Sequence, residues 1–167
     1  LSNGGTYNLV TKEINNERSS LYDEESVQNR IKEIESNKLD YEIEINLPFE
    51  KINFMRLLKS AAQKAASKSE ISDNYSFIFS LIDGESLRAR FLVKTEESSV
   101  TPMRLNEEIT LENFSEIIID YRYFYGLLTS IYHWNNAEVG SMYLTRRVPL
   151  DNFNESVQNY LNFLATC

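Results

Sequence analysis

Side chains with chemical capability gather in one short stretch near the C-terminal end of this 167-residue chain. The stretch holds the only histidine and the only tryptophan, with two amides, one acid and two adjacent arginines close behind. Side chains with fixed hydrogen-bond geometry beside a large ring suit a ligand pocket or a pinned structural turn. The candidate binding residues of this chain are His133, Trp134, Asn135, Asn136, Glu138 and Arg147.

His133 has the side chain best suited to bind a metal or to act as a general base. A metal site needs several ligands, and the sequence contains no second histidine. No nucleophile-elbow pattern is present to supply a serine for a Ser–His–acid set. We therefore predict no metal ligand and no catalytic residue, and expect His133 to fix a turn. An acid–base pair of His133 with Glu138 is the remaining enzymatic alternative.

Asn135 and Asn136 can each offer one carbonyl and two N–H donors to a polar ligand, with Trp134 as a stacking surface. The alternative is that the two amides cap the turn between a preceding helix and the final strand. Glu138 is expected to form an ion pair with Arg146 or Arg122. Side chains alternate along a strand, so only one residue of the Arg146-Arg147 pair can enter a pocket.

Composition and charge exclude several classes of function. A net charge of −8 and a pI near 4.8 oppose binding to a phosphate backbone, so no nucleic-acid partner is predicted. The single cysteine allows no intramolecular disulfide, which fits a reducing compartment and predicts a cytoplasmic location. No apolar run reaches the length of a membrane span. Phosphate-loop and dinucleotide-binding motifs are absent from the sequence, and we predict no cofactor.

Hydrophobic periodicity predicts an α+β fold. Residues 1–22 are expected to be a polar lead-in and residues 23–167 a single domain. The chain begins with Leu1, and we expect it to be the C-terminal part of a larger protein. The expected helices span 23–36, 48–67 and 122–130, with a last helix capped by Asn152. The expected strands are 39–47, 75–82, 87–94, 116–121 and 139–145, and residues 95–104 are expected to form a loop.

Two sequence patterns determine the expected sheet. Asp83-Gly84 is a strong hairpin turn between residues 75–82 and 87–94. The alternation of apolar and acidic residues over 39–47 predicts a half-exposed strand. The elements together predict an antiparallel or mixed sheet of about five strands with helices packed on one side.

The segment from Ile117 onward resembles the C-terminal region of large metallo-β-lactamase-fold hydrolases similar to CMP-N-acetylneuraminate hydroxylase. The likeness rests on HWNNAE and on Trp134, Ser141, Arg147 and Pro149. It implies that the metal-binding histidines belong to an upstream catalytic domain, which would be the partner of this domain. A homodimer is also implied as a possible assembly. The order of elements additionally resembles the lipid-binding fold of sterol carrier protein type 2.

Three functional hypotheses follow. The first is a non-catalytic accessory domain of a metallo-hydrolase, which contributes Trp134, Asn135, Asn136 and Arg147 to an interface or a substrate edge. The second is a module that binds a small molecule or lipid between sheet and helices, in an apolar cavity of at least ~300 Å³. The third is an independent enzyme that uses His133 and Glu138.

Overall fold

A computed structural model describes residues 6–15, 24–69, 71, 74–151 and 154–166. The chain divides into two compact units, Leu1–Leu39 and Asp40–Cys167. The first unit contains a short antiparallel hairpin of β1 (Thr6–Tyr7) and β2 (Ile14–Asn15), and the helix α1 (Glu24–Ser36). The helix predicted over 23–36 is thus confirmed. Its apolar stripe of Val27, Ile31 and Ile34 is about half exposed.

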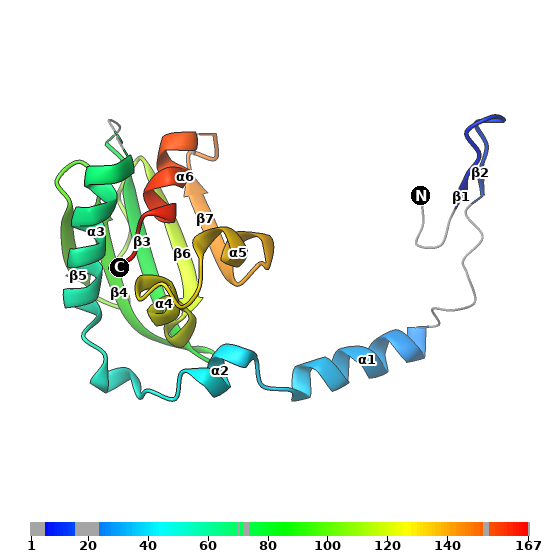
Figure 1. Ribbon diagram of the computed structural model, residues 1–167, viewed down its shortest axis with the longest axis horizontal. Coiled ribbons are helices and arrows are strands. Elements are labelled where there is room, and N and C mark those ends of the chain that lie inside the picture. The colour runs from blue at the N-terminus through cyan, green and yellow to red at the C-terminus, as the bar shows by residue number, and fades with distance from the viewer. Residues whose placement is uncertain (1–5, 16–23, 70, 72–73, 152–153, 167) are drawn as a thin grey trace. The chain divides into compact units, whose positions relative to one another are not determined.

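The second unit is built on a mixed five-stranded sheet with helices packed on one side, as Figure 1 shows. The strand order is β5-β4-β3-β6-β7, and every neighbouring pair is antiparallel except β3 with β6. The predicted α+β class and sheet size are therefore confirmed. The strands are β3 (Ser76–Asp83), β4 (Ser86–Lys94), β5 (Ser99–Met103), β6 (Phe114–Asp120) and β7 (Tyr143–Val148).

The helices lie on one side of this sheet, and all of them except α2 bury apolar side chains. They are α2 (Asp40–Glu44), α3 (Phe54–Ser69), α4 (Tyr121–Leu128), α5 (Trp134–Val139) and α6 (Glu155–Asn162), with a 3-10 turn η1 (Phe49–Lys51) before α3. Three alanines of α3 are fully buried, and small side chains let a helix lie close to its neighbours. Rings fill the centre of the core, where Phe77 stacks on Tyr160 at 5.6 Å and Phe79 lies 4.9 Å from Phe124.

The strand predicted over 39–47 is wrong, because residues 40–44 form the helix α2 and the chain then runs without regular structure to Pro48. Only Ile45 of the alternating apolar residues is buried. The Tyr41 ring packs edge-on against Tyr123 of α4 at 5.3 Å, and the Tyr132 hydroxyl donates to Glu44 at 2.5 Å. Tertiary contacts with tyrosines therefore override the local period-two pattern.

Two further differences concern β5 and the C-terminal third. Residues 95–104, predicted as a loop, contain the edge strand β5, where Pro102 is tolerated because an edge strand leaves one side unpaired. The final strand begins at Tyr143 rather than at Val139, because residues 134–139 form α5. The predicted cap Asn152 lies outside the described residues, and the observed cap of α6 is Asn154, whose Oδ1 accepts from the Val157 N–H.

The sheet face opposite the helices carries a buried charged cluster. Arg90 donates to Glu116 at 3.1 Å, to Ser80 at 3.3 Å and to the carbonyl of Glu107 at 2.7 Å. The Ser80 hydroxyl also donates to Glu116 at 2.7 Å, so the cluster links β4, β3 and β6. Glu107 belongs to the connection between β5 and β6, which is fixed on this face by the contact with Arg90.

Candidate functional site

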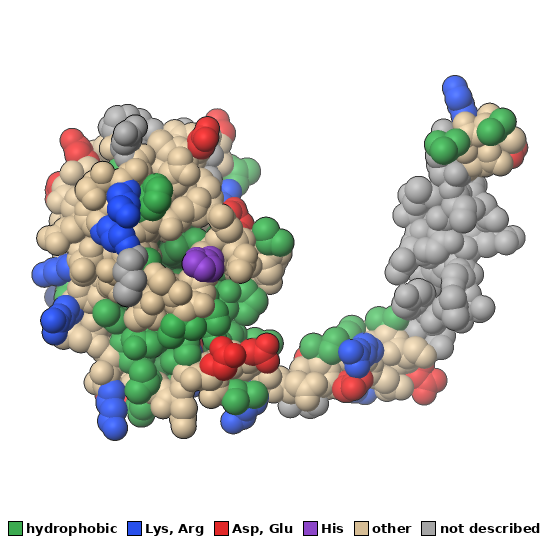
Figure 2. Space-filling model, viewed as in Figure 1, with side chains coloured by type: hydrophobic (Ala, Val, Ile, Leu, Met, Phe, Trp, Pro, Cys, Tyr) green, Lys and Arg blue, Asp and Glu red, His purple; other side chains and the backbone are tan. Residues whose placement is uncertain are grey.

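The single histidine and tryptophan occupy opposite environments although they are adjacent in the chain. His133 is exposed, directly precedes α5 and makes no side-chain capping bond; it is the purple side chain in Figure 2. Trp134 is buried, and its Nε1 donates to the Leu164 carbonyl at 3.1 Å. Its ring lies about 6 Å from the rings of Phe79, Phe124 and Tyr143. Trp134 therefore anchors α5 and the C-terminal tail to the core.

The remaining predicted site residues do not converge with His133. Asn135, Asn136 and Glu138 are exposed on α5. The Glu138 carboxylate lies 4.0 Å from Arg147 on β7, rather than beside Arg146 or Arg122 as predicted. No contact joins His133 to Glu138 in the part of the chain that the structure describes. The arrangement brings together one weak ion pair and an exposed amide-bearing surface, which we call the α5 surface (residues 133–139).

A concave site lies elsewhere, where residues 47–53 run beside α3 and α4. We call residues 47–53 the η1 segment and this site the η1–α4 groove, which has a volume of about 400 Å³. Figure 2 shows hydrophobic side chains gathered over α4 and the start of α3. The apolar lining is Leu47, Ile52 and Leu57; the polar lining is Lys51, Asn53, Arg56, Ser60, Tyr125 and Thr166.

Local structure explains why these residues meet. Pro48 has the extended conformation that precedes η1, and Asn53 begins α3 by accepting from the Arg56 N–H at 3.0 Å. Thr166 is held beside the groove because its N–H and its hydroxyl donate to the Leu128 carbonyl at 2.7 and 2.9 Å. The groove is therefore assembled from three segments that are distant in sequence.

A second hollow of about 380 Å³ lies on the β4 side of the same η1 segment. Its lining includes Ala89 and Phe91 of β4, and it shares Lys51, Ile52 and Asn53 with the groove. The η1 segment thus separates two hollows, one against α4 and one against the sheet.

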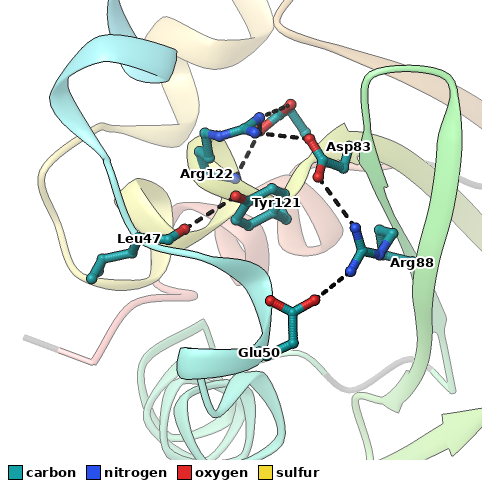
Figure 3. A network of polar contacts seen from close by, with 7 residues as sticks. Leu47, Glu50, Asp83, Arg88, Tyr121 and Arg122 are labelled. Atoms are coloured by element: carbon teal, nitrogen blue, oxygen red, sulfur yellow. Dashed lines mark hydrogen bonds and ion pairs between the residues drawn. The ribbon is translucent and has the colours of Figure 1, made fainter.

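A network of polar contacts holds the η1 segment against the sheet (Figure 3). Arg88 contacts Glu50 at 2.5 Å and Asp83 at 3.3 Å, and its guanidinium lies 5.1 Å from the centre of the Phe49 ring. The Tyr121 hydroxyl donates to the Leu47 carbonyl at 3.1 Å. An irregularity in β3–β4 pairing between Leu81 and Ile82 accompanies this arrangement, and such bulges re-aim nearby side chains.

The network continues to the start of α4. Arg122 contacts Asp83 at 2.8 Å and Asp120 at 3.0 Å, and the Asp120 Oδ1 caps α4 by accepting from the Arg122 N–H at 2.8 Å. Burial raises the pKa of Asp120, although Arg122 opposes that rise. Burial, followed by the charge of Asp120, raises the pKa of Tyr41 to about 12, so this phenol stays neutral at physiological pH. These groups stabilise the fold around the groove.

The sequence did not indicate the groove, because its signal is weak. Lys51, Arg56, Lys59, Lys64 and Lys68 are the charged residues of the stretch from Lys51 through α3, and no acid interrupts them. That run of cations in an acidic chain was the available clue. Among the described residues, no three His, Cys, Asp or Glu side chains are arranged to hold a metal ion. None of the described helices has the length and apolarity to cross a membrane.

Comparisons with known proteins establish no family for this chain. No protein-family model and no curated protein matches it, and the resemblance to metallo-β-lactamase-fold hydrolases finds no support there. A solved structure similar to this chain is that of sterol carrier protein-2 like-3 from Aedes aegypti. It has 13% sequence identity, covers 66% of this chain and 92% of its own, and gives a TM-score of 0.47. Similarity at that level establishes no function.

Proposed function

We propose that Asp40–Cys167 is a binding module for a small apolar molecule, which it holds in the η1–α4 groove. The observation that carries the proposal is a groove of about 400 Å³ with three aliphatic side chains in its lining. Ligand sites are typically concave and mostly apolar, with a few polar groups that orient the ligand. The groove lies between the η1 segment and the helices α3 and α4, and not between sheet and helices as predicted, because stacked rings fill that interior space. A ligand therefore enters the groove without displacing those rings.

Filling the groove tests this proposal. Ser60 lines it, so Ser60→Trp places a large ring in the space, whereas Ser67→Trp puts the same ring on the exposed part of α3 seven residues later. Decanol titrated into the protein and followed by amide NMR is expected to show saturable shifts around the groove. We expect Ser60→Trp to weaken binding at least tenfold and Ser67→Trp to leave it unchanged. Binding that is non-saturable, or equally affected by both substitutions, would refute the proposal.

A second candidate is the accessory-domain function, in which the α5 surface contacts an upstream catalytic domain or a second copy. The observation in its favour is that two large apolar side chains near the exposed amides are strongly exposed, Val139 at 88% and Leu144 at 71%. In this role Asn135, Asn136 and Arg147 contribute to the interface, and Trp134 holds α5 in place from beneath.

The coding sequence upstream of Leu1 provides a test of the second candidate. Reading the codons before Leu1 is expected to give an in-frame H-x-H-x-D-H run, the metal-binding motif of such a catalytic domain. An upstream reading frame that lacks this motif would remove the accessory-domain function. The groove proposal is independent of that result.

A further inference from the structure

We propose that the η1–α4 groove selects its ligand by an anionic head group, so that the preferred ligand is a single apolar chain ending in an acid. The inference rests on the proposed function, because it assigns a ligand class to that same groove. The first observation is the charge of the groove lining. Two lining residues, Lys51 and Arg56, are cationic, and none is acidic. The chain as a whole carries −8, so a cationic lining is a local reversal of sign.

Both cations are available to a ligand. Lys51 and Arg56 are exposed, and neither is in an ion pair among the residues that the structure describes. Glu50 precedes Lys51 in the chain, but its carboxylate is bound by Arg88 and it lines the hollow on the β4 side. The acid nearest in sequence is therefore already neutralised on the other side of the η1 segment.

The order of exposure within the groove gives the expected orientation of the ligand. Ile52 and Leu57 are half-buried, whereas Lys51 and Arg56 are exposed to solvent, as is the third aliphatic side chain, Leu47. An apolar chain would cover the aliphatic side chains, and its charged end would remain between the two cations. An ammonium at the same place would be repelled, and an uncharged alcohol would gain only the apolar contacts.

Matched ten-carbon ligands test this selectivity. Decanoate, decanol and decyltrimethylammonium share one chain and differ in head-group charge, so comparing their dissociation constants isolates the head group. We expect decanoate to bind at least tenfold tighter than decanol, and decyltrimethylammonium to bind more weakly than decanol. The advantage of decanoate over decanol should shrink as salt is raised, since ions screen exposed charges.

Substitution of the two cations completes the test. The double variant Lys51→Gln and Arg56→Gln is expected to bring the ratio of decanoate affinity to decanol affinity close to one, because neither ligand then gains a charge contact. Lys59→Gln is the matched control, since Lys59 lies on the same helix but does not line the groove. If all three ligands bind equally, the head-group inference is overturned and the groove function stands. If none of them binds, the groove function itself fails.

Discussion

Arg88 and Arg90 lie two residues apart on β4, yet they make very different kinds of contact. Arg90 is 6% exposed and its partner Glu116 is 12% exposed, with Ser80 and a backbone carbonyl completing the cluster. Arg88 is 34% exposed and its partner Glu50 is 69% exposed. Removing one partner of a buried pair strands a charge in the interior, whereas an exposed pair is screened by water. The buried Arg90–Glu116 pair therefore stabilises its face of the sheet strongly, whereas the exposed Arg88–Glu50 pair contributes little to holding the η1 segment.

The largest effect is expected from breaking the buried cluster. Glu116→Ala leaves the Arg90 guanidinium buried without its carboxylate, which should lower the free energy of unfolding by about 3–5 kcal/mol. Urea denaturation measures the loss. Glu97→Ala serves as the control, because Glu97 pairs with Lys94 in an exposed i,i+3 contact, so the loss of stability should be far smaller than in Glu116→Ala. Similar losses of stability for both variants would contradict the claim that the buried Arg90–Glu116 pair costs more to break than an exposed pair.

Gly126→Ala tests how tightly the helices pack at a position in α4 that lies outside the η1 segment. A Cβ at Gly126 would lie 2.3 Å from the Tyr132 ring, which stacks on Tyr123 at 4.7 Å. The ring has to move, and we expect a loss of about 1–3 kcal/mol in the free energy of unfolding. In a Tyr132→Ala background the same substitution should cost much less. A cost that does not depend on the tyrosine would contradict this account.

Arg88→Ala is expected to leave global stability within about 1 kcal/mol of the parent protein, because its ion pairs are exposed. Its effect should be local, because Glu50 and Phe49 of the η1 segment lose their contacts with Arg88. Amide hydrogen exchange is therefore expected to rise in residues 47–57. Lys94→Ala, also on β4, is the control and should leave that exchange unchanged. Unaltered exchange in Arg88→Ala would mean that other contacts hold the segment.

The smallest effect expected is a pH dependence that comes from Asp120. Because burial raises its pKa, the folded protein keeps this proton at pH values where the unfolded chain has released it. Stability should therefore fall as pH rises from about 4 through the raised pKa. Asp120→Asn keeps an oxygen for the Arg122 N–H and should remove that part of the slope. Urea denaturation from pH 3.5 to 6 compares the two proteins, and identical slopes would contradict the prediction.

The parts of the fold that were predicted correctly have strong local signals. Alternating residues around Asp83-Gly84 were sufficient for the β3–β4 hairpin, and the 3.6-residue periodicity was sufficient for α1 and for the body of α3. The predicted start of the second helix at residue 48 is wrong, because Phe49–Lys51 form the 3-10 turn η1 and α3 begins at Phe54. The strand prediction for residues 39–47 failed because it used only the local alternation of residues. The helix that forms there depends on contacts with tyrosines about eighty residues later. The groove could not be predicted, because Lys51, Tyr125 and Thr166 become neighbours only in the folded chain.

The parallel pairing of β3 with β6 has a consequence for the chain as it is made. β4 follows β3 directly and can close on it as a hairpin, whereas the contact from Ser80 to Glu116 spans 36 residues. Non-local parallel pairing forms slowly. Until the ribosome has released Phe114–Asp120, one edge of the apolar strand β3 has no neighbour and can add a strand from another nascent chain. Aggregation during synthesis should therefore depend on how quickly β6 emerges.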